Sequence, residues 1–596
     1  GFTGSYVRLS EFRGAEKQGP KTLEAIQNPD CGWFYTAKPD DFKKIPGSPV
    51  AYWADKAIID LFDGCKLMKD VAMPRQGMAT TNNDLFVRLW TEVDGRKLNL
   101  CATGQTDAQE SGAKWFPYNK GGEFRRWYGN NRFVVNYENS GQTICDYIDN
   151  TPGVKVKSNG RVINRDKYFK ECITWSKVSS GAPAFRYIPT GFAFDVAGTS
   201  IFSTKHEQIL KNLGFCNSRV VTNILKFLSP TLNYEVGHIA SLPIIADAMD
   251  AISEAKVTQL IEIARNDWDQ FEQSWGFTES PIVKYRLAGS LSSGFEIYKT
   301  QLDGLHSEAA SIEDEVNQSI ERSLNLSGII SAESETIERF VHEAEKDAES
   351  QRLISYMVGC MMGRYSLDTP GLIYAHAGNE GFEPNRYETF PADEDGIVPI
   401  TDEAWFDDDG ANRIREFVRV VWGEDTEAEN MAWLAESLGS KASESADDTI
   451  RRYLSKGFYK DHLQTYKKRP IYWLFSSGKH KAFEALVYLH RYNAGTLSRM
   501  RMEYVVPLQS RMQSRIDNLE QDIQSSTSSA EQKRFQKQKD KLIKQLDELR
   551  RFDENLRHYA DQRITLDLDD GVKVNYGKFG DLLAEVKAVT GKKAGD

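Results

Sequence analysis

The sequence changes character at residues 257–271, which read VTQLIEIARNDWDQF. Apolar side chains recur there at the spacing of one helix face: Val257, Leu260, Ile261, Ala264, Trp268 and Phe271. A single apolar stripe of this kind predicts a long amphipathic helix. Before it, to about residue 245, short β-prone runs such as 133–137 alternate with Gly, Asn and Pro turn signals, and helix-prone stretches dominate after it. We therefore predict an α+β multidomain protein, a mixed α/β region followed by a mainly α-helical one.

The chain is too long for one hydrophobic core, because 596 residues correspond to roughly three to five structural units. Residues 303–350 are acidic and helix-prone, and residues 366–402 are rich in Pro, Gly, Asp and Glu, which indicates a loop or linker. These changes of composition predict four parts: a connector at 1–71, a mixed α/β domain at 72–245, a helical domain with acidic helices and a linker at 246–402, and a C-terminal helical domain at 403–596.

Residues 506–560 predict two antiparallel helices that project as coiled arms. Their apolar residues stand among alternating charges: Ile516, Leu519, Ile523, Phe535, Leu542, Leu546, Leu549 and Leu556. The serine-rich break at 525–529 supplies the turn, and Ser529 with Gln532 predicts a capping box for the second helix.

Charge and cysteine content restrict the class of protein. The formal net charge is -11, so a nucleic-acid site must be a local basic patch on an acidic body. The seven cysteines include no CxxC pair, which indicates reduced thiols in the cytoplasm and no zinc site. No apolar stretch approaches the roughly 20 residues that span a bilayer, and no secretion signal opens the chain. The opening GFTGSYVRL lacks methionine, and we interpret it as the interior of a longer protein.

The densest functional signal is the block at 114–130, KWFPYNKGGEFRRWYGN. Phosphate neutralisation is assigned to its cations and the one that follows: Lys114, Lys120, Arg125, Arg126 and Arg132. Stacking or wedging against bases is assigned to Tyr118, Trp127 and Tyr128, and close backbone approach to a phosphate to Gly121 and Gly122. Composition alone supports equally a solvated basic surface whose aromatic residues belong to the core.

A second segment, 173–189, places small hydroxyl groups beside a glycine and an arginine. Ser179, Ser180 and Arg186 are candidates for base readout, because hydroxyl and guanidinium groups reach base edges or phosphates. A hairpin turn with satisfied serines is the alternative interpretation. Between the two segments a basic run continues the positive charge: Lys155, Lys157, Arg161, Arg165, Lys167 and Lys170.

Motifs of known catalytic chemistry are missing from the sequence. It has no Pro-Pro dipeptide, so it lacks the Asp/Asn-Pro-Pro-Tyr/Phe loop with which amino-methyltransferases hold an extruded adenine. A Gly-rich nucleotide turn, HExxH, GxSxG and the P-loop are also absent. We therefore expect no catalytic residue, no bound cofactor and no metal in this chain.

Several of these segments resemble the PglX family, the adenine-specific DNA methyltransferases of BREX phage-defence systems, which share their layout with type IIG restriction-modification enzymes. The segments include IPGSPVAYW at 45–53, GMATTNNDLFVR at 77–88 and RPIYWLFSS at 469–477. The others lie at 114–130, 173–202, 233–244, 488–492 and 569–576. The resemblance implies that 1–71 connects from a methyltransferase domain and that 72–245 is the target-recognition domain.

The resemblance also implies a role. The complete enzyme would transfer a methyl group from S-adenosylmethionine to the N6 amine of one adenine and so mark host DNA. The family's catalytic domain precedes every matching segment, so this chain should recognise DNA and bind partners without methylating alone. Expected partners are double-stranded DNA, other BREX proteins and a phage protein that mimics DNA. A separate specificity subunit and a purely protein-binding scaffold remain as alternatives.

Overall fold

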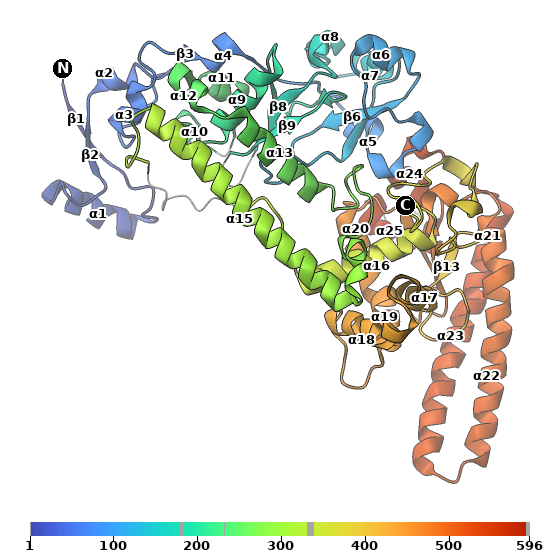
Figure 1. Ribbon diagram of the computed structural model, residues 1–596. Coiled ribbons are helices and arrows are strands. Elements are labelled where there is room, and N and C mark those ends of the chain that lie inside the picture. The colour runs from blue at the N-terminus through green and yellow to red at the C-terminus, as the bar shows by residue number, and fades with distance from the viewer. Residues whose placement is uncertain (1, 179–182, 230, 232, 331–338, 592–596) are drawn as a thin grey trace.

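The computed structural model describes residues 2–178, 183–229, 231, 233–330 and 339–591. It confirms the predicted mixture of helices and small sheets, with long helices only in the later part of the chain. Figure 1 shows an elongated molecule: the strand-rich part lies at one end, the long helix α15 (Leu291–Ser323) runs obliquely across, and a helical hairpin projects from the other end. Within the described ranges, no helix is both long and apolar enough to cross a membrane.

The first 71 residues contain a two-stranded sheet and several helices. Strand β1 (Gly4–Val7) pairs antiparallel with β2 (Phe34–Ala37). The helices are α1 (Ala15–Gln27), α2 (Pro39–Phe42), α3 (Lys56–Asp60) and α4 (Met68–Val71). The side chain of Asp55 accepts a hydrogen bond from the amide of Ala57, which caps α3. Strand β3 (Lys66–Leu67) pairs with β12 (Pro243–Ile244), so the two ends of the 72–245 range lie together.

The range 72–245 contains two four-stranded sheets. One has the order β10-β6-β7-β5 and the other β4-β11-β8-β9. The first consists of β5 (Val87–Leu89), β6 (Trp115–Asn119), β7 (Phe133–Asn136) and β10 (Ala193–Phe194). The second consists of β4 (Met73–Arg75), β8 (Cys172–Trp175), β9 (Phe185–Ile188) and β11 (Ser200–Phe202).

The sheets are joined where β6 ends. The Nδ2 of Asn119 donates to Thr174 Oγ1 at 2.6 Å and to the Gly198 carbonyl at 3.1 Å. A Cβ on Gly198 would lie 2.1 Å from the Asn119 carbonyl oxygen, so only glycine permits this close approach. The helices of this range are α5 (Asn83–Phe86), α6 (Gln105–Glu110), α7 (Glu138–Asn150), α8 (Ser158–Arg161), α9 (His206–Cys216), α10 (Arg219–Leu228) and α11 (Val236–Ala240).

Most of the stripe at 257–271 forms the predicted amphipathic helix, α13 (Glu254–Trp268), with its apolar side buried, whereas Phe271 lies beyond the helix end and is partly buried. Helices α12 (Ala246–Ala251), α14 (Pro281–Lys284) and α16 (Lys346–Met361) accompany it. Helix α15 has 33 residues, about 50 Å, and ties distant parts together. At its start the Leu291 amide donates to Asn430, and near its end Glu321 accepts from Arg219 at 2.8 Å.

The C-terminal range contains a sheet that the sequence analysis missed. Strands β13 (Ile397–Pro399), β15 (Glu484–Tyr488) and β14 (Tyr472–Ser476) pair antiparallel in that order. The central strand β15 is buried at every position, and such strands read as continuous apolar runs without the alternation that marks a half-buried strand. The helices here are α17 (Gly410–Trp422), α18 (Glu427–Ser437), α19 (Ala446–Tyr453), α20 (Tyr459–Thr465), α21 (Thr496–Arg499), α24 (Val572–Gly577) and α25 (Val586–Thr590).

The segment 366–402, predicted as a loop or linker, is irregular but packed. Ile373, Tyr374 and Phe390 are buried, and β13 belongs to the C-terminal sheet. The division into four parts therefore remains a prediction. The pairing of β13 with β15 crosses the predicted boundary at residue 402.

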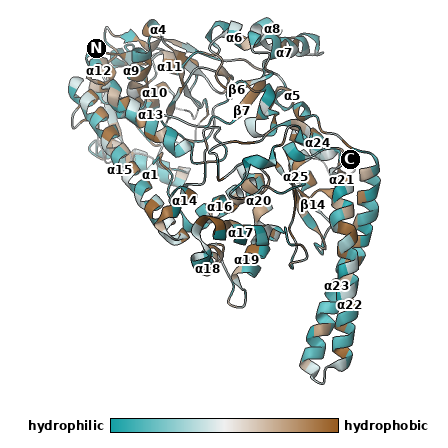
Figure 2. Cartoon of the chain, turned by 45° about the vertical axis from the view of Figure 1, so that its right-hand side comes forward, coloured by the Kyte–Doolittle hydropathy of each residue, from teal (hydrophilic) through white to brown (hydrophobic). Residues whose placement is uncertain are grey.

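The projecting hairpin confirms the predicted antiparallel helices as α22 (Val506–Ser525) and α23 (Ser529–Asp561). Leu519, Leu542 and Leu549 are buried in the seam, and Figure 2 shows hydrophilic outer faces along the arm. The predicted cap was wrong by one residue: Ser528 caps α23 by accepting from the amide of Glu531. Ser529 is already the first helical residue, so its neighbour's hydroxyl occupies the capping position.

Candidate nucleic-acid interface

The structure brings the two segments singled out in the sequence into direct contact. The amide of Trp127 donates to the Phe185 carbonyl at 2.9 Å, and the amide of Tyr187 donates to the Trp127 carbonyl at 2.8 Å. The hydroxyl of Ser176 also donates to the Gly122 carbonyl at 2.9 Å. The 114–130 block and the described residues of the 173–189 segment therefore lie against each other.

The glycine pair has a local structural reason. Gly121 and Gly122 have φ values of 74° and 146°. A Cβ on Gly121 would lie 2.8 Å from the Ala197 carbonyl oxygen, and one on Gly122 would lie 2.8 Å from the Asn130 side chain. Packing alone thus demands both glycines, and phosphate approach is not needed to explain them.

Buried Asp195 holds two of the predicted contact residues. Its Oδ2 accepts from Tyr118 Oη at 2.8 Å and pairs with Lys120 Nζ at 3.3 Å. Tyr118 is 1% exposed, and burial together with the Asp195 charge raises the pKa of its phenol. Lys120 keeps about a quarter of its side chain exposed, 24%. Of this pair, only Lys120 offers its side chain to solvent.

The double arginine at 125–126 pairs with carboxylates from the helical range. Both terminal nitrogens of Arg125 donate to Asp267 Oδ2, at 2.9 and 2.8 Å. Arg126 lies 3.3 Å from Glu313 Oε1, which also accepts from Trp127 Nε1 at 2.6 Å. Burial raises the pKa of Glu313, although the Arg126 charge opposes this. These contacts fasten residues 125–127 to α13 and α15.

Arg132, Tyr128 and Lys114 also contact residues from other parts of the chain. Arg132 stacks over Trp268 at 5.1 Å, and Arg265 lies over the ring of buried Tyr128 at 4.8 Å. Lys114 pairs at 2.9 Å with Asp569, a residue near the C-terminus.

In this conformation the three aromatic rings assigned to base stacking belong to the core. Tyr118, Trp127 and Tyr128 are at most 6% exposed, which agrees with the alternative that composition had left open. The five assigned cations each face a carboxylate. Sequence reasoning missed four of those partners because they lie 75 to 455 residues away along the chain and belong to no motif, whereas the carboxylate facing Arg132 is Glu123 of the block itself. The DNA-contact assignments themselves stay predictions.

Arg186 differs from the other cations of the site. It is 1% exposed, and no carboxylate in the described part of the chain pairs with it. Its Nη1 and Nη2 make long contacts, 3.4 Å to the Arg125 carbonyl and 3.5 Å to Ser176 Oγ, and its Nε has no partner. Burial and the nearby Arg125 charge lower its pKa to about 10. Ser179 and Ser180, predicted beside it, lie outside the described residues.

The basic run between the two segments keeps its charge at the surface. Lys155, Lys157 and Lys170 are exposed, and Arg161 and Lys167 are partly exposed. Lys157 donates to the Asp149 backbone carbonyl at 2.8 Å, and its charge is one of the causes that lower the pKa of the Asp149 carboxyl. This run is part of the accessible positive surface of the 72–245 range, which also includes the exposed Lys205.

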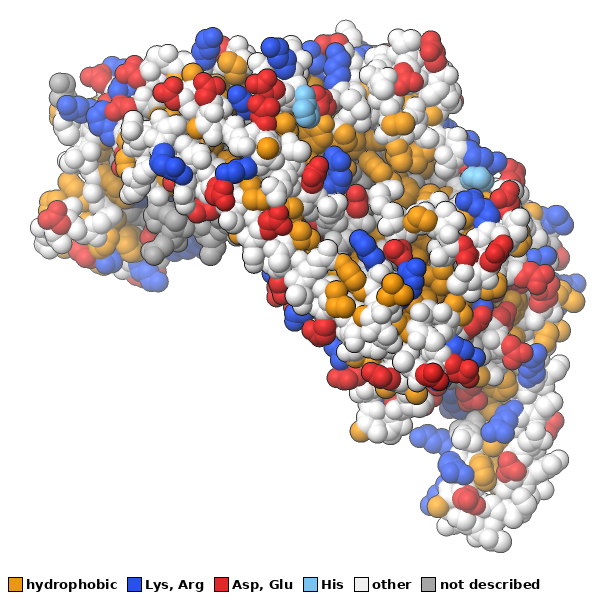
Figure 3. Space-filling model, viewed as in Figure 1, with side chains coloured by type: hydrophobic (Ala, Val, Ile, Leu, Met, Phe, Trp, Pro, Cys, Tyr) orange, Lys and Arg blue, Asp and Glu red, His pale blue; other side chains and the backbone are white. Residues whose placement is uncertain are grey.

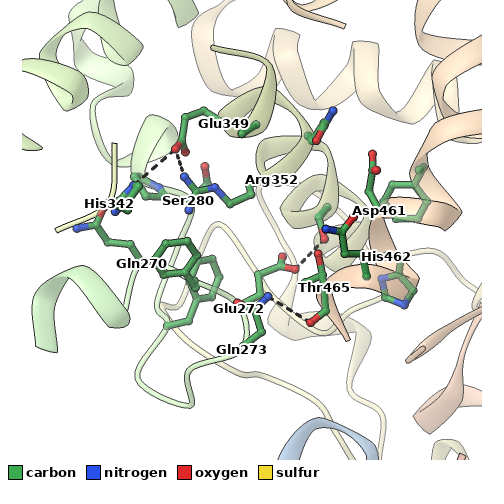
Figure 4. A pocket seen from close by; sticks show the side chains of 18 of the residues that line it. Gln270, Glu272, Gln273, Ser280, His342, Glu349, Arg352, Asp461, His462 and Thr465 are labelled. Atoms are coloured by element: carbon green, nitrogen blue, oxygen red, sulfur yellow. Dashed lines mark hydrogen bonds and ion pairs between the residues drawn. The ribbon is translucent and has the colours of Figure 1, made fainter. Parts of the chain in front are cut away.

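A cavity of about 680 Å³ lies where this range meets the two helical ones. Figure 4 shows its lining, which includes residues from 270–281, α16 and α20. Glu123 and Arg132, from the connection between β6 and β7, complete it. The cavity therefore marks the junction of the three ranges. No group of three or more metal-ligating side chains occurs in the part of the chain that the structure describes.

Two buried titratable groups, Glu272 and His462, line this cavity. Glu272 Oε2 accepts from Ser355 at 2.7 Å and from Tyr466 at 3.3 Å, and burial raises its pKa. His462 Nε2 accepts two backbone amides at 3.1 Å, from residues 471–472, so its Nδ1 carries the proton. Burial lowers the pKa of His462 to about 3, which keeps the ring neutral.

Asp569 gives the first testable prediction. Burial by itself would raise the pKa of its carboxyl, but hydrogen bonds from Lys97, Lys114 and Trp115 outweigh burial and lower the pKa to about 2. The unfolded value is about 3.9. The ionised carboxyl therefore stabilises the fold fully above pH about 4, and this stabilisation is lost as the pH falls towards 2. We expect Asp569→Asn to lower the urea midpoint at neutral pH and to leave it nearly unchanged near pH 2. An equal loss at both pH values would contradict this assignment.

Comparison with known proteins places the chain in a family, although no family model matches it. It is 44% identical over 586 residues to the adenine-specific methyltransferase BrxX of Escherichia coli O9:H4 (strain HS), covering 94% of this chain and 46% of the relative. It is 37% identical over 586 residues to the adenine-specific methyltransferase PglX of Lacticaseibacillus casei (strain Zhang), covering 97% and 48%. The chain thus spans about half the length of the curated relatives it matches. With this agreement along nearly its whole length, the chain belongs to the PglX family of BREX adenine-specific methyltransferases.

Proposed function

We propose that this chain is the DNA-recognition and partner-binding portion of a site-specific adenine-N6 DNA methyltransferase that marks host DNA in BREX phage defence. The observation that carries the proposal is the match to two adenine-specific methyltransferases over nearly the whole chain but only about half of each relative. S-adenosylmethionine and the Pro-Pro catalytic loop would belong to the half of the enzyme that this chain does not match.

The recognition role has a physical basis in the energetics of base extrusion. An adenine must leave the duplex to be methylated, which costs a few kcal/mol of stacking and pairing. A grip on the flanking duplex offsets that cost. We assign the first phosphate contacts to the exposed run of Lys155, Lys157 and Lys170.

Deeper contact would involve Arg186 and the paired arginines. The buried guanidinium of Arg186 lacks a carboxylate, so a phosphate or a guanine edge would supply the acceptors that the described chain does not. For Arg125 and Arg126 to bind phosphates, DNA must displace Asp267 and Glu313. Ser179 and Ser180 remain candidates for base readout.

The test is fluorescence-anisotropy binding of the chain to short duplexes across a salt series. We expect the triple variant Lys155→Gln, Lys157→Gln, Lys170→Gln to reduce the slope of log K against log salt by about 3 units, because each phosphate contact contributes about 0.9. A control with Lys284→Gln, Lys299→Gln and Lys456→Gln removes the same charge from exposed positions elsewhere and should bind like the wild type.

A protein-binding scaffold is the second candidate function. The core placement of Tyr118, Trp127 and Tyr128 and the internal pairing of the basic block favour it. Absence of DNA binding by the wild-type chain at low salt would support the scaffold and exclude autonomous recognition. The proposed partners are double-stranded DNA, other BREX proteins and a phage protein that mimics DNA at the same basic surface.

A further inference from the structure

The distal part of α23 carries a concentration of positive charge that the recognition surface does not use. Residues 533–544 contain six Lys and Arg side chains against one Asp, in a chain whose formal net charge is -11. They run from near the hairpin tip to the point where Lys541 meets Asp402 of the body at 2.5 Å. Figure 3 shows Lys and Arg side chains on the projecting hairpin towards its tip.

Helical geometry gathers most of these cations on one side of the arm. At 3.6 residues per turn, Lys533, Arg534, Lys537, Lys541 and Lys544 fall within an arc of about 100°. The buried residues of α23 at 542, 546 and 549 lie on another face, towards α22. All five cations are exposed, so the stripe points away from the helix that α23 packs against.

Most of the stripe is not neutralised by the protein. Lys541 pairs with Asp402, and Lys539, which lies outside the stripe on the side of α23 towards α22, pairs with Glu520 at 3.4 Å. The other four stripe cations make no ion pair with any residue that the structure describes: Lys533, Arg534, Lys537 and Lys544. Asp540, the acidic neighbour, accepts a hydrogen bond from Gln536 at 2.8 Å.

The chemistry of the stripe favours a polyanion over a protein partner. Lysine is depleted at protein interfaces, whose affinity comes from buried aromatic and arginine anchors. Here the only exposed large apolar side chain of 533–544 is Ile543, at 43%. A row of cations from Lys533 to Lys544 spans about 16 Å, and Gln536 and Gln538 can add neutral donors to phosphate oxygens. These are the features of a contact to the nucleic-acid backbone that carries no sequence information.

We propose that this basic stripe is a second DNA contact, which binds the phosphate backbone of duplex flanking the recognised site. The inference rests on the proposed function, because it assigns an additional surface to the same duplex. The arm then supplies salt-dependent affinity, while discrimination between sequences stays with the 72–245 range.

The experiment measures DNA binding by the full chain through fluorescence anisotropy. It compares a duplex of about 20 base pairs with one of about 45 base pairs, which is longer by about 3.4 Å for each added base pair. The arm variant combines Lys533→Gln, Arg534→Gln, Lys537→Gln and Lys544→Gln, which keep helix propensity and lie outside the buried seam. Its control combines Lys284→Gln, Lys299→Gln, Lys456→Gln and Lys460→Gln. We expect the arm variant to lose affinity for the longer duplex, with a salt slope smaller by about 3 to 4 units, and the control to match the wild type.

The outcomes separate this inference from the proposed function. If the arm variant binds both duplexes with the affinity and salt slope of the wild type, the stripe proposal is wrong even though recognition stands. An arm variant that keeps DNA affinity but no longer binds an acidic protein would likewise overturn it in favour of a protein contact. If the arm variant weakens binding while the Lys155, Lys157 and Lys170 variant does not, the stripe is supported and the recognition surface is misassigned. Absence of wild-type binding to either duplex would reject both.

Discussion

Replacing Trp127 with alanine lowers the free energy of unfolding by about 3–5 kcal/mol, the range for removing a buried aromatic side chain. The ring is 2% exposed, and its Nε1 donates to Glu313 at 2.6 Å. Its loss leaves a cavity between the 114–130 block and α15 and removes a hydrogen bond from a buried carboxyl. The midpoint of urea unfolding, followed by circular dichroism, measures the effect.

Trp127→Phe is the matched control, because it keeps a six-membered aromatic ring and removes the indole N–H with the five-membered ring that carries it. We expect a smaller loss, about 1–3 kcal/mol for the unsatisfied partner. If Trp127→Ala left the unfolding midpoint unchanged and abolished DNA binding, the ring would contact DNA and would not be part of the core.

Replacing Asp267 with alanine lowers the free energy of unfolding by a similar amount, about 3–5 kcal/mol, because it breaks a buried charge network on one side. Asp267 is fully buried between Arg125 at 2.8 Å and His342 Nδ1 at 2.6 Å. Removal of the carboxylate leaves the Arg125 guanidinium and the His342 ring without the partner that Asp267 supplies. The urea midpoint again reports the loss, with Asp250→Ala, at an exposed acid on α12, as the control.

The same network predicts weaker stability in acid. Burial by itself would raise the pKa of Asp267, but the hydrogen bond from His342 and the charge of Arg125 lower it. Its stabilisation is therefore present above the unfolded value of about 3.9 and is lost as the pH falls below it. Burial lowers the pKa of His342, so the unfolded state takes up a proton below about pH 6.5 and stability declines from there.

Asp267→Asn distinguishes a structural from a DNA-linked role for Arg125. The amide keeps the volume and an acceptor for the His342 amide, which donates at 2.9 Å, but it removes the charge that holds Arg125. If phosphate competes with Asp267 for Arg125, the variant is less stable and yet binds DNA more tightly. A decrease in both stability and DNA affinity would show that Arg125 only fastens the loop to α13.

Local patterns in the sequence were sufficient for several elements. The spacing at 257–271 predicted α13, and the apolar seam with its serine-rich break predicted the α22–α23 hairpin. Both depend on contacts within a few turns or between adjacent helices, which periodicity records directly. The β13-β15-β14 sheet escaped notice because burial on both faces erases strand alternation.

The family was likewise determined by the sequence, because ordered segments along the whole chain match adenine-specific methyltransferases. Only the tertiary structure decided which members of the 114–130 block are core and which cations are already paired. Arg125 meets Asp267 and Lys114 meets Asp569 across 142 and 455 residues. A charge or an aromatic ring has the same appearance in a sequence whether water, a carboxylate or a packed core surrounds it. The fold chooses among these environments through long-range packing, which no local pattern encodes.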